Sequence, residues 1–154
     1  QLSDKIVKKT NGNRALITDL RGGDFAHAGD KESINFVLSK LKDNDKIKES
    51  NVLNFGSGYG GTAGYLYKKG FKKIWGVDKD PNAVTYASKN YPNIKFFKSD
   101  VSELTKRFRK DFFSSIFMFN VVYAIPNKQA LLKNIAKTSE PGALLVIFDY
   151  TKLK

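Results

Sequence analysis

A short apolar stretch that runs directly into a glycine-rich turn is the feature that most constrains this chain of 154 residues. Val52–Phe55 predicts a strand, and it is followed at once by Gly56, Gly58, Gly60 and Gly61 and then by a helical segment. Glycine allows positive φ and close approach of the backbone to a ligand, and the first amides of the helix carry partial positive charge. We therefore expect this turn to bind a nucleotide-like ligand.

The glycine spacing fits two kinds of loop. Gly56, Gly58 and Gly61 match the dinucleotide-binding fingerprint, whereas Gly60 in place of Gly61 gives the tighter GxGxG loop of methyltransferases. A strand-to-helix turn that binds no ligand is the third interpretation. The glycines alone leave all three open.

The composition limits the class of protein. The length suits a single domain, and the apolar fraction of 41% is enough for a buried core. No apolar run is long enough to cross a bilayer and no secretory signal pattern opens the chain, so we expect a cytoplasmic protein. The absence of cysteine and the single histidine exclude thiolate and multi-histidine metal sites, and we predict no metal.

The formal net charge of +12 raises the question of a nucleic-acid partner. Most lysines are single or paired and are spread along the chain. The one dense basic cluster, Lys106–Lys110, is typical of a helix end, where cations suit the helix dipole. We therefore predict solvated basic side chains and no nucleic-acid groove.

Strand and helix patterns alternate in the second part of the sequence. The predicted strands cover residues 51–55, 72–77, 94–97, 113–120 and 143–149, and the predicted helices cover residues 60–69, 81–90, 101–109 and 127–138. Such alternation predicts an α/β fold, a Rossmann-like parallel sheet of about five strands with helices on both faces. In such sheets the ligand lies at the carboxyl ends of the strands.

Local signals define several element ends. From Lys31 on, the spacing of apolar residues predicts a helix with one apolar face, before the first strand. Asp80 followed by Pro81 predicts a helix start, and Gly70 predicts a helix end. Pro141-Gly142 is expected to turn the chain into the last strand.

The two ends of the chain differ from its middle. Residues 1–30 are polar and glycine-punctuated, and we expect them to form an arm or lid beside a domain that spans 31–154. The chain begins at Gln1 and stops soon after the apolar strand at 143–149, so we expect a fragment whose last strand has an open edge. Missing sequence or a partner, including a second copy through self-association, would cover that edge.

With the glycine turn, Asp78 and Ser99-Asp100 in place, the chain from about residue 27 to 152 resembles the class I S-adenosylmethionine-dependent methyltransferases, particularly the small-molecule branch. The resemblance implies S-adenosylmethionine as cofactor and methyl transfer to a small-molecule acceptor as the activity. It also implies a domain truncated at its C-terminal end, without the antiparallel hairpin of the family.

The resemblance assigns the glycine loop to the methionine part of the cofactor. The residues that carry this assignment are Gly56, Ser57, Gly58 and Gly60. Asn54 stands where the family usually has an acidic residue that helps to hold the ammonium group of the cofactor. We expect the neutral amide to weaken that electrostatic contribution.

Further cofactor-binding residues follow the next three strands. Asp78 comes about twenty residues beyond the glycines, where a carboxylate can accept hydrogen bonds from both ribose hydroxyls, and Lys79 follows it. The resemblance implies that Asp100 accepts from the adenine amino group and that Val101 lies against the ring. Helix capping is the alternative role for both aspartates. The resemblance places Asn120 beside the transferable methyl group.

The segment Phe113–Tyr123 lacks the Asn/Asp-Pro-Pro-aromatic signature of many methyltransferases that act on planar amino groups of adenine, cytosine or glutamine. Its absence argues against a base-flipping role.

The catalytic residues stay unassigned. His27, Tyr123 and Tyr150 are candidate bases, but the protein's main task in methyl transfer is to align the acceptor and exclude water. Two other functions stay open. One is a nicotinamide-dependent oxidoreductase, which would share the glycine turn and Asp78, and the other is a non-catalytic methyltransferase-like binding module.

Overall fold

The computed structural model describes residues 23–25 and 30–152. The strands are β1 (Asn51–Phe55), β2 (Lys73–Asp78), β3 (Lys95–Lys98), β4 (Phe113–Phe119) and β5 (Ser139–Phe148). The helices are α3 (Asp30–Lys40), α4 (Asn44–Glu49), α5 (Gly61–Lys68), α6 (Pro81–Asn90), α7 (Leu104–Arg107) and α8 (Lys128–Thr138), with a short 3-10 helix η1 (Val122–Ala124). Most of the predicted arm, including His27, lies outside the described residues.

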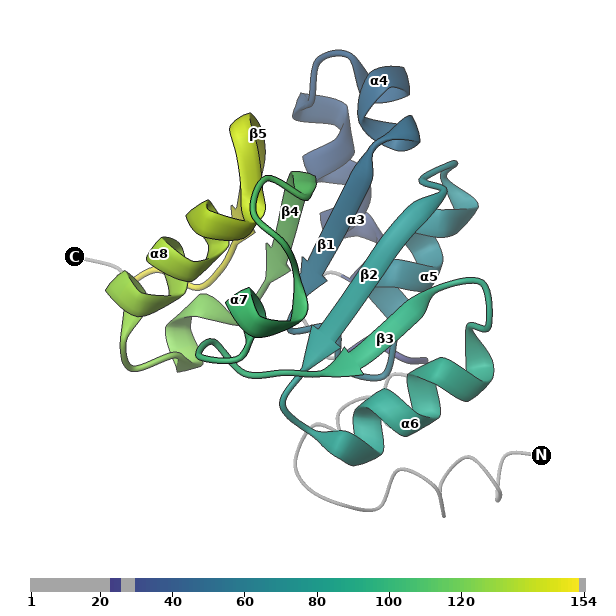
Figure 1. The fold of residues 1–154 in the computed structure, drawn as a ribbon. Coiled ribbons are helices and arrows are strands. Elements are labelled where there is room, and N and C mark those ends of the chain that lie inside the picture. Colours follow the sequence, from purple (N-terminus) through teal and green to yellow (C-terminus); the bar gives the residue numbers. More distant parts are fainter. Residues whose placement is uncertain (1–22, 26–29, 153–154) are drawn as a thin grey trace.

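The described strands form one parallel sheet with the order β3-β2-β1-β4-β5. Helices cover both faces, with α3 and α5 behind the sheet and α7 in front of it in Figure 1. This arrangement confirms the predicted Rossmann-like α/β fold. The carboxyl ends of β1, β2 and β3 point downward in Figure 1, so the loops that follow them meet at one edge.

Alternate residues of the strands enter two separate hydrophobic clusters, because successive side chains of a strand point to opposite faces of the sheet. Val52 packs in one cluster with Ile34 of α3 and Leu66 of α5. Its neighbour Leu53 packs in the other cluster with Leu131 of α8. Both faces of the sheet are therefore buried, as is typical of a parallel sheet.

Several predicted helix ends are confirmed. The Asp80 side chain accepts a hydrogen bond from the Asn82 N–H at 2.9 Å, and Pro81 is the first residue of α6. Gly70 follows α5 with a φ of 103°. The predicted helix at 101–109 is shorter than expected, because the turn that follows Asp100 delays the start of α7 to Leu104.

The last strand differs from its prediction. Pro141-Gly142 lies inside β5 and does not precede it, since the strand already begins at Ser139. Phe113 pairs with Ser139, but Ser115 pairs with Leu144, so extra residues of β5 form an irregularity between these two points. Proline has no N–H for the ladder and a glycine φ of 78° bends the backbone, which suits such a bulge.

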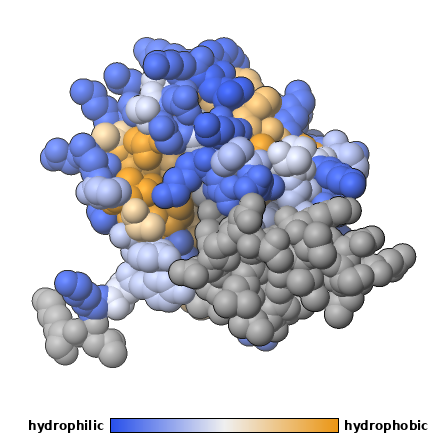
Figure 2. All heavy atoms as spheres, turned by 90° about the horizontal axis from the view of Figure 1, so that it is seen from below, coloured by the Kyte–Doolittle hydropathy of each residue, from blue (hydrophilic) through white to orange (hydrophobic). Residues whose placement is uncertain are grey.

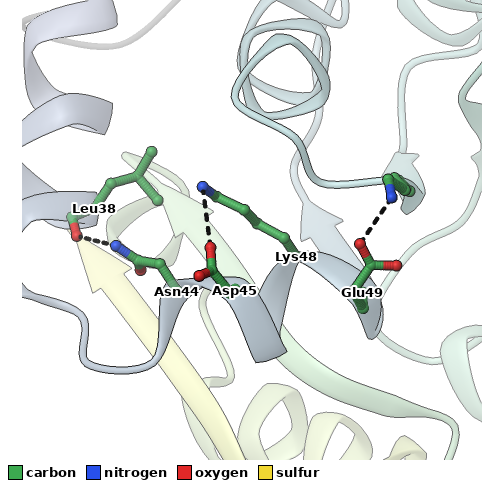
Figure 3. Close-up of polar contacts among 6 residues, drawn as sticks. Leu38, Asn44, Asp45, Lys48 and Glu49 are labelled. Atoms are coloured by element: carbon green, nitrogen blue, oxygen red, sulfur yellow. Dashed lines mark hydrogen bonds and ion pairs between the residues drawn. The ribbon is translucent and has the colours of Figure 1, made fainter.

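Helix α4, which is not among the predicted elements, joins α3 to β1 at the edge of the sheet away from the carboxyl ends (Figure 1). Asn44 Nδ2 donates to the Leu38 carbonyl at 3.2 Å, as Figure 3 shows. Glu49 forms an ion pair with Lys72 at 2.8 Å, and the hydrogen bond from Lys72 lowers the pKa of Glu49. The part-buried Asn44 contact and the exposed ion pair connect the elements that lead into β1 and β2.

None of the helices in the described part of the chain combines the length and the apolar character of a membrane span.

Candidate functional site

A cavity of about 310 Å³ lies at the carboxyl ends of the strands. Figure 2 looks onto the molecule from that side and shows apolar surface gathered between hydrophilic side chains. The predicted site residues that line the cavity are Gly56, Ser57, Gly58, Asp78, Lys79, Asp100, Val101 and Asn120. Asn54 and Gly60 are predicted site residues that are not in this lining.

The glycine loop is hydrogen-bonded to the neighbouring strand β2, and Val121 packs against it. The backbone N–H groups of Gly56 and Ser57 both donate to the Val77 carbonyl, at 2.8 and 2.9 Å. Gly56 has a φ of 75°, and a Cβ there would lie 2.5 Å from Val121 Cγ2. Only glycine fits both the conformation and the space at this position.

Gly60 serves packing between elements. A Cβ at Gly60 would lie 2.8 Å from the Tyr91 ring and 3.0 Å from Ala87 Cβ, so glycine lets α5 begin close against α6. At the next position, a Cβ on Gly61 would lie 2.6 Å from the backbone oxygen of Asp24. This part of the loop therefore accommodates α6 and the segment 23–25.

Asp78 is only 4% exposed, and the backbone around it holds both of its oxygens. Oδ2 accepts the Gly58 N–H at 2.8 Å, and Oδ1 accepts the Asp80 N–H at 3.0 Å. Because Asp80 itself caps α6, Asp78 does not have the alternative capping role. A carboxylate oxygen can accept more than one hydrogen bond, so the group can also serve a ligand in the cavity.

Asp100 closes the turn that precedes α7 and is not its N-cap, which is Glu103. Its Oδ1 accepts the Ser102 hydroxyl at 2.7 Å and the backbone N–H groups of Ser102 and Glu103 at 2.8 and 3.1 Å. The Ser102 hydroxyl contributes most to lowering the pKa of Asp100 below its usual value. Asp100 also lines the cavity beside Val101, so its place in the turn is compatible with ligand binding.

Two asparagines lie at the ends of the central strands. Asn54 is 1% exposed, and its Nδ2 donates to the Phe117 carbonyl at 3.3 Å, which ties β1 to β4. Asn120 has a φ of 51° and donates its backbone N–H to the Phe148 carbonyl at 2.7 Å. The side-chain oxygens of both residues are buried and have no hydrogen-bond partner among the described residues.

The cavity lining includes buried oxygen atoms that could accept hydrogen bonds from a ligand. Besides Asn120 Oδ1, the hydroxyl of Ser57 is buried and has no partner among the described residues. Buried polar groups in proteins are nearly always hydrogen-bonded, so such atoms on the walls of a cavity are compatible with a polar ligand. Among the residues that the structure describes, no group of three His, Cys, Asp or Glu side chains is placed to hold a metal ion.

Asp24 is a cavity residue that the sequence did not reveal. Its Oδ1 accepts the Tyr86 hydroxyl at 2.9 Å and its Oδ2 accepts the Tyr91 hydroxyl at 2.6 Å. Burial, and then the carboxylate of Asp24, raise the pKa of Tyr91. An aspartate in a polar segment carries no local signal that pairs it with tyrosines more than sixty residues away.

Tyr123 and Tyr150 are brought together at the cavity. Their ring centroids are 5.2 Å apart with planes at 80°, and each side chain is 58% exposed. Asp149 fixes both backbones, since its Oδ2 accepts the Tyr123 N–H at 3.2 Å and its Oδ1 accepts the Tyr150 N–H at 2.8 Å. The third candidate base, His27, lies outside the described residues.

Curated relatives of this chain are methyltransferases. Phosphoethanolamine N-methyltransferase of Plasmodium falciparum (isolate 3D7) is 29% identical over 134 residues, which cover 84% of this chain and 48% of that protein. A putative protein N5-glutamine methyltransferase of Methanocaldococcus jannaschii is 39% identical over 88 residues, which cover 54% of this chain and 42% of that protein. The chain thus spans about half the length of these relatives or less.

Solved structures share the fold. A chain in the complex between the Haloferax volcanii Trm112 methyltransferase activator and the putative methyltransferase has a TM-score of 0.71 at 16% identity, over 94% of this chain and 59% of that one. A putative sarcosine dimethylglycine methyltransferase from Galdieria sulphuraria has a TM-score of 0.65 at 17% identity, over 88% and 49%. The family described as a methyltransferase domain matches residues 26–153. The chain therefore belongs to the methyltransferase-domain family, whose fold its parallel sheet shares.

Proposed function

We propose that this chain binds S-adenosylmethionine in the 310 Å³ cavity and transfers its methyl group to a small-molecule acceptor. The observation that carries the proposal is the buried Asp78 carboxylate at the end of β2, held by the N–H of Gly58. A rigid carboxylate beside a glycine loop is the arrangement that binds a ribose diol next to a charged or polar tail.

The lining residues suit the parts of the cofactor. Asp78 would hold the ribose, and the loop at Gly56–Gly58 would hold the methionine part. Asp100 and Val101 would hold the adenine, and Asn120 would lie beside the methyl group. Lys79 is exposed on the lining and would stay at the solvent side of the ribose.

Asn54 and Gly60 support the loop from outside the cavity lining. Asn54 ties β1 to β4 through the Phe117 carbonyl immediately before the glycines. Gly60 allows α5 to start against Tyr91. We propose that both residues act on the cofactor by positioning the loop.

When bound, S-adenosylmethionine would supply a methyl group on a positively charged sulfur, open to in-line attack by an acceptor lone pair on the methyl carbon, with the electron pair of the broken carbon–sulfur bond left on sulfur. The chain itself aligns the acceptor and excludes water. Apolar lining residues suited to excluding water are Phe119, Val121 and Ile125, close to the tyrosine pair.

A small molecule is favoured as methyl acceptor over the side-chain amide of a protein glutamine or a nucleobase. The P. falciparum relative is named for phosphoethanolamine, a small amine, and it matches 84% of this chain. The M. jannaschii relative is named for protein glutamine, but it matches only 54% of the chain. The segment Phe113–Tyr123 lacks the signature expected for planar amino groups. The cytoplasmic location, the lack of a nucleic-acid partner and self-association through the β5 edge stay predictions from the sequence.

Calorimetric titration with S-adenosylhomocysteine, and separately with NAD, tests the proposal. We expect S-adenosylhomocysteine to bind and to raise the melting temperature of the chain, since a ligand stabilises the fold to which it binds. NAD should do neither. Binding of NAD in preference would support an oxidoreductase. Cofactor binding without turnover on any amine would support the non-catalytic binding module.

A further inference from the structure

A second hollow of about 340 Å³ adjoins the cofactor cavity at the ends of β4 and β5. Tyr123 and Tyr150 line both spaces, so the two rings are a shared wall between them. A molecule in the second hollow would therefore lie next to the cavity that we assign to the cofactor.

The shared wall is held in place by one carboxylate. Asp149 accepts the backbone N–H of Tyr123 at 3.2 Å and of Tyr150 at 2.8 Å, which ties η1 to the segment after β5. The two rings meet edge to face at 5.2 Å. The wall is thus built from two segments that the Asp149 side chain joins.

The charged residues of the second hollow favour an anion. Lys128 and Lys152 line it, and Lys128 Nζ donates to the Ile125 carbonyl at 3.0 Å, which anchors this ammonium group. Asp149 is the one acidic side chain among the described lining residues, and both of its oxygens already accept N–H groups. Two cations therefore face one carboxylate that is already hydrogen-bonded.

We propose that the second hollow is the acceptor site and that Lys128 and Lys152 select an acceptor with an acidic group, a phosphate or a carboxylate. The inference rests on the proposed function and names its substrate class. The acidic group lies against the lysines, and the nucleophilic end of the acceptor passes Tyr123 and Tyr150 into the cofactor cavity. Val122 and Ile147 are apolar residues that also line the hollow, and they suit the carbon skeleton between the two ends.

The test is direct anion binding, measured without any methyl transfer. Inorganic phosphate and acetate are titrated at constant ionic strength, with chloride as the balancing anion, into the chain with and without saturating S-adenosylhomocysteine. Backbone amide resonances of Tyr123 and Tyr150 report the binding. The variants are Lys128→Gln, Lys152→Gln and the double variant. The matched control is Lys133→Gln, an exposed lysine of α8 that does not line the hollow.

We expect saturable shifts in the unchanged chain and in the control, and at least a tenfold weaker affinity in the double variant. Tighter phosphate binding indicates a phosphorylated acceptor, and tighter acetate binding indicates a carboxylate acceptor. Equal affinity of the double variant and the control overturns the site, provided that their thermal unfolding agrees. If anions bind through the lysines but S-adenosylhomocysteine does not bind at all, the proposed function fails and the acceptor role fails with it.

Discussion

The carboxylate of Asp78 and the backbone N–H of Gly58 are joined by a hydrogen bond of 2.8 Å, so the end of β2 and the glycine loop after β1 form one unit. The bond is buried, and a second backbone N–H, that of Asp80, holds the other oxygen of the carboxylate. The same side chain therefore shapes the loop and lines the cavity.

Replacing Asp78 with Ala should weaken the binding of S-adenosylhomocysteine by about 1.5–3 kcal/mol, because charge-assisted hydrogen bonds are lost. This corresponds to about 10- to 150-fold in the dissociation constant, measured by calorimetry. Asp80→Asn is the control, since Asp80 does not line the cavity and asparagine also caps helices well. Unchanged affinity in the Asp78 variant would reject the ribose assignment.

Replacing Gly56 with Ala should destabilise the fold by more than the same change at Gly142. Both glycines have nearly the same positive φ, 75° and 78°, so alanine costs about 1–2 kcal/mol at either position. At Gly56 the new Cβ would also lie 2.5 Å from Val121, whereas nothing lies within 4 Å at Gly142. Urea unfolding of both variants measures the difference, and the double change with Val121→Ala should recover the steric part alone. Equal losses in the two single variants would contradict this explanation.

Replacing Tyr91 with Phe should cost about 1–3 kcal/mol of folding stability, because a hydrogen bond to a charged group is lost while the ring still packs. Tyr86 would remain as the second donor to Asp24. Tyr67→Phe is the control for an exposed tyrosine. Thermal unfolding at neutral pH measures both variants, and a loss of the same size in the control would exclude a specific role for the Asp24 contact.

Because of the Tyr91 hydroxyl, we expect the folding stability to depend on pH in the alkaline range. The pKa of Tyr91 is raised in the folded chain by burial and by Asp24, so the unfolded chain releases this proton first. The contribution of the Tyr91 hydroxyl to folding stability is complete below the usual tyrosine pKa of 10.0. It is lost as the pH rises above that value towards the raised pKa of the folded chain. Unfolding curves from pH 8 upward should converge for Tyr91→Phe and the unchanged chain, and parallel curves would contradict the raised pKa.

Replacing Asn54 with Asp, an acidic residue of the kind that the resemblance leads us to expect there, should destabilise this chain by about 2–4 kcal/mol at neutral pH. The change removes the donor to the Phe117 carbonyl and buries a charge without a partner. Burial raises the pKa of such a carboxyl, so the loss should grow as the pH rises above the usual aspartate value of about 3.9.

The control for this change is Asn51→Asp at the other end of β1. Asn51 makes the same kind of bond, from Nδ2 to the Phe112 carbonyl at 3.1 Å, but it is only partly buried. Its variant should lose less stability in urea unfolding. Stability of the Asn54 variant that does not change between pH 4 and 7 would contradict the argument.

Local sequence signals were sufficient to predict the structure at positions where one residue type favours one backbone conformation. The glycines after β1 and the Asp80-Pro81 helix start could be read directly, because positive φ and helix capping depend on neighbours in the chain. Alternating strands and helices predicted the parallel sheet for the same reason. Pro141-Gly142 was misleading, because pairing of Ser139 with the distant Phe113 extends β5 across a dipeptide that usually ends a strand.

The sequence by itself determined the order of elements, the glycine loop and the candidate carboxylates, since each depends on spacing along the chain. Only the tertiary structure decided that Asp24 meets Tyr86 and Tyr91, and that Tyr123 and Tyr150 divide two spaces. These relationships join residues far apart in sequence. Their partners are selected by packing and burial in three dimensions, which no local pattern of residues encodes.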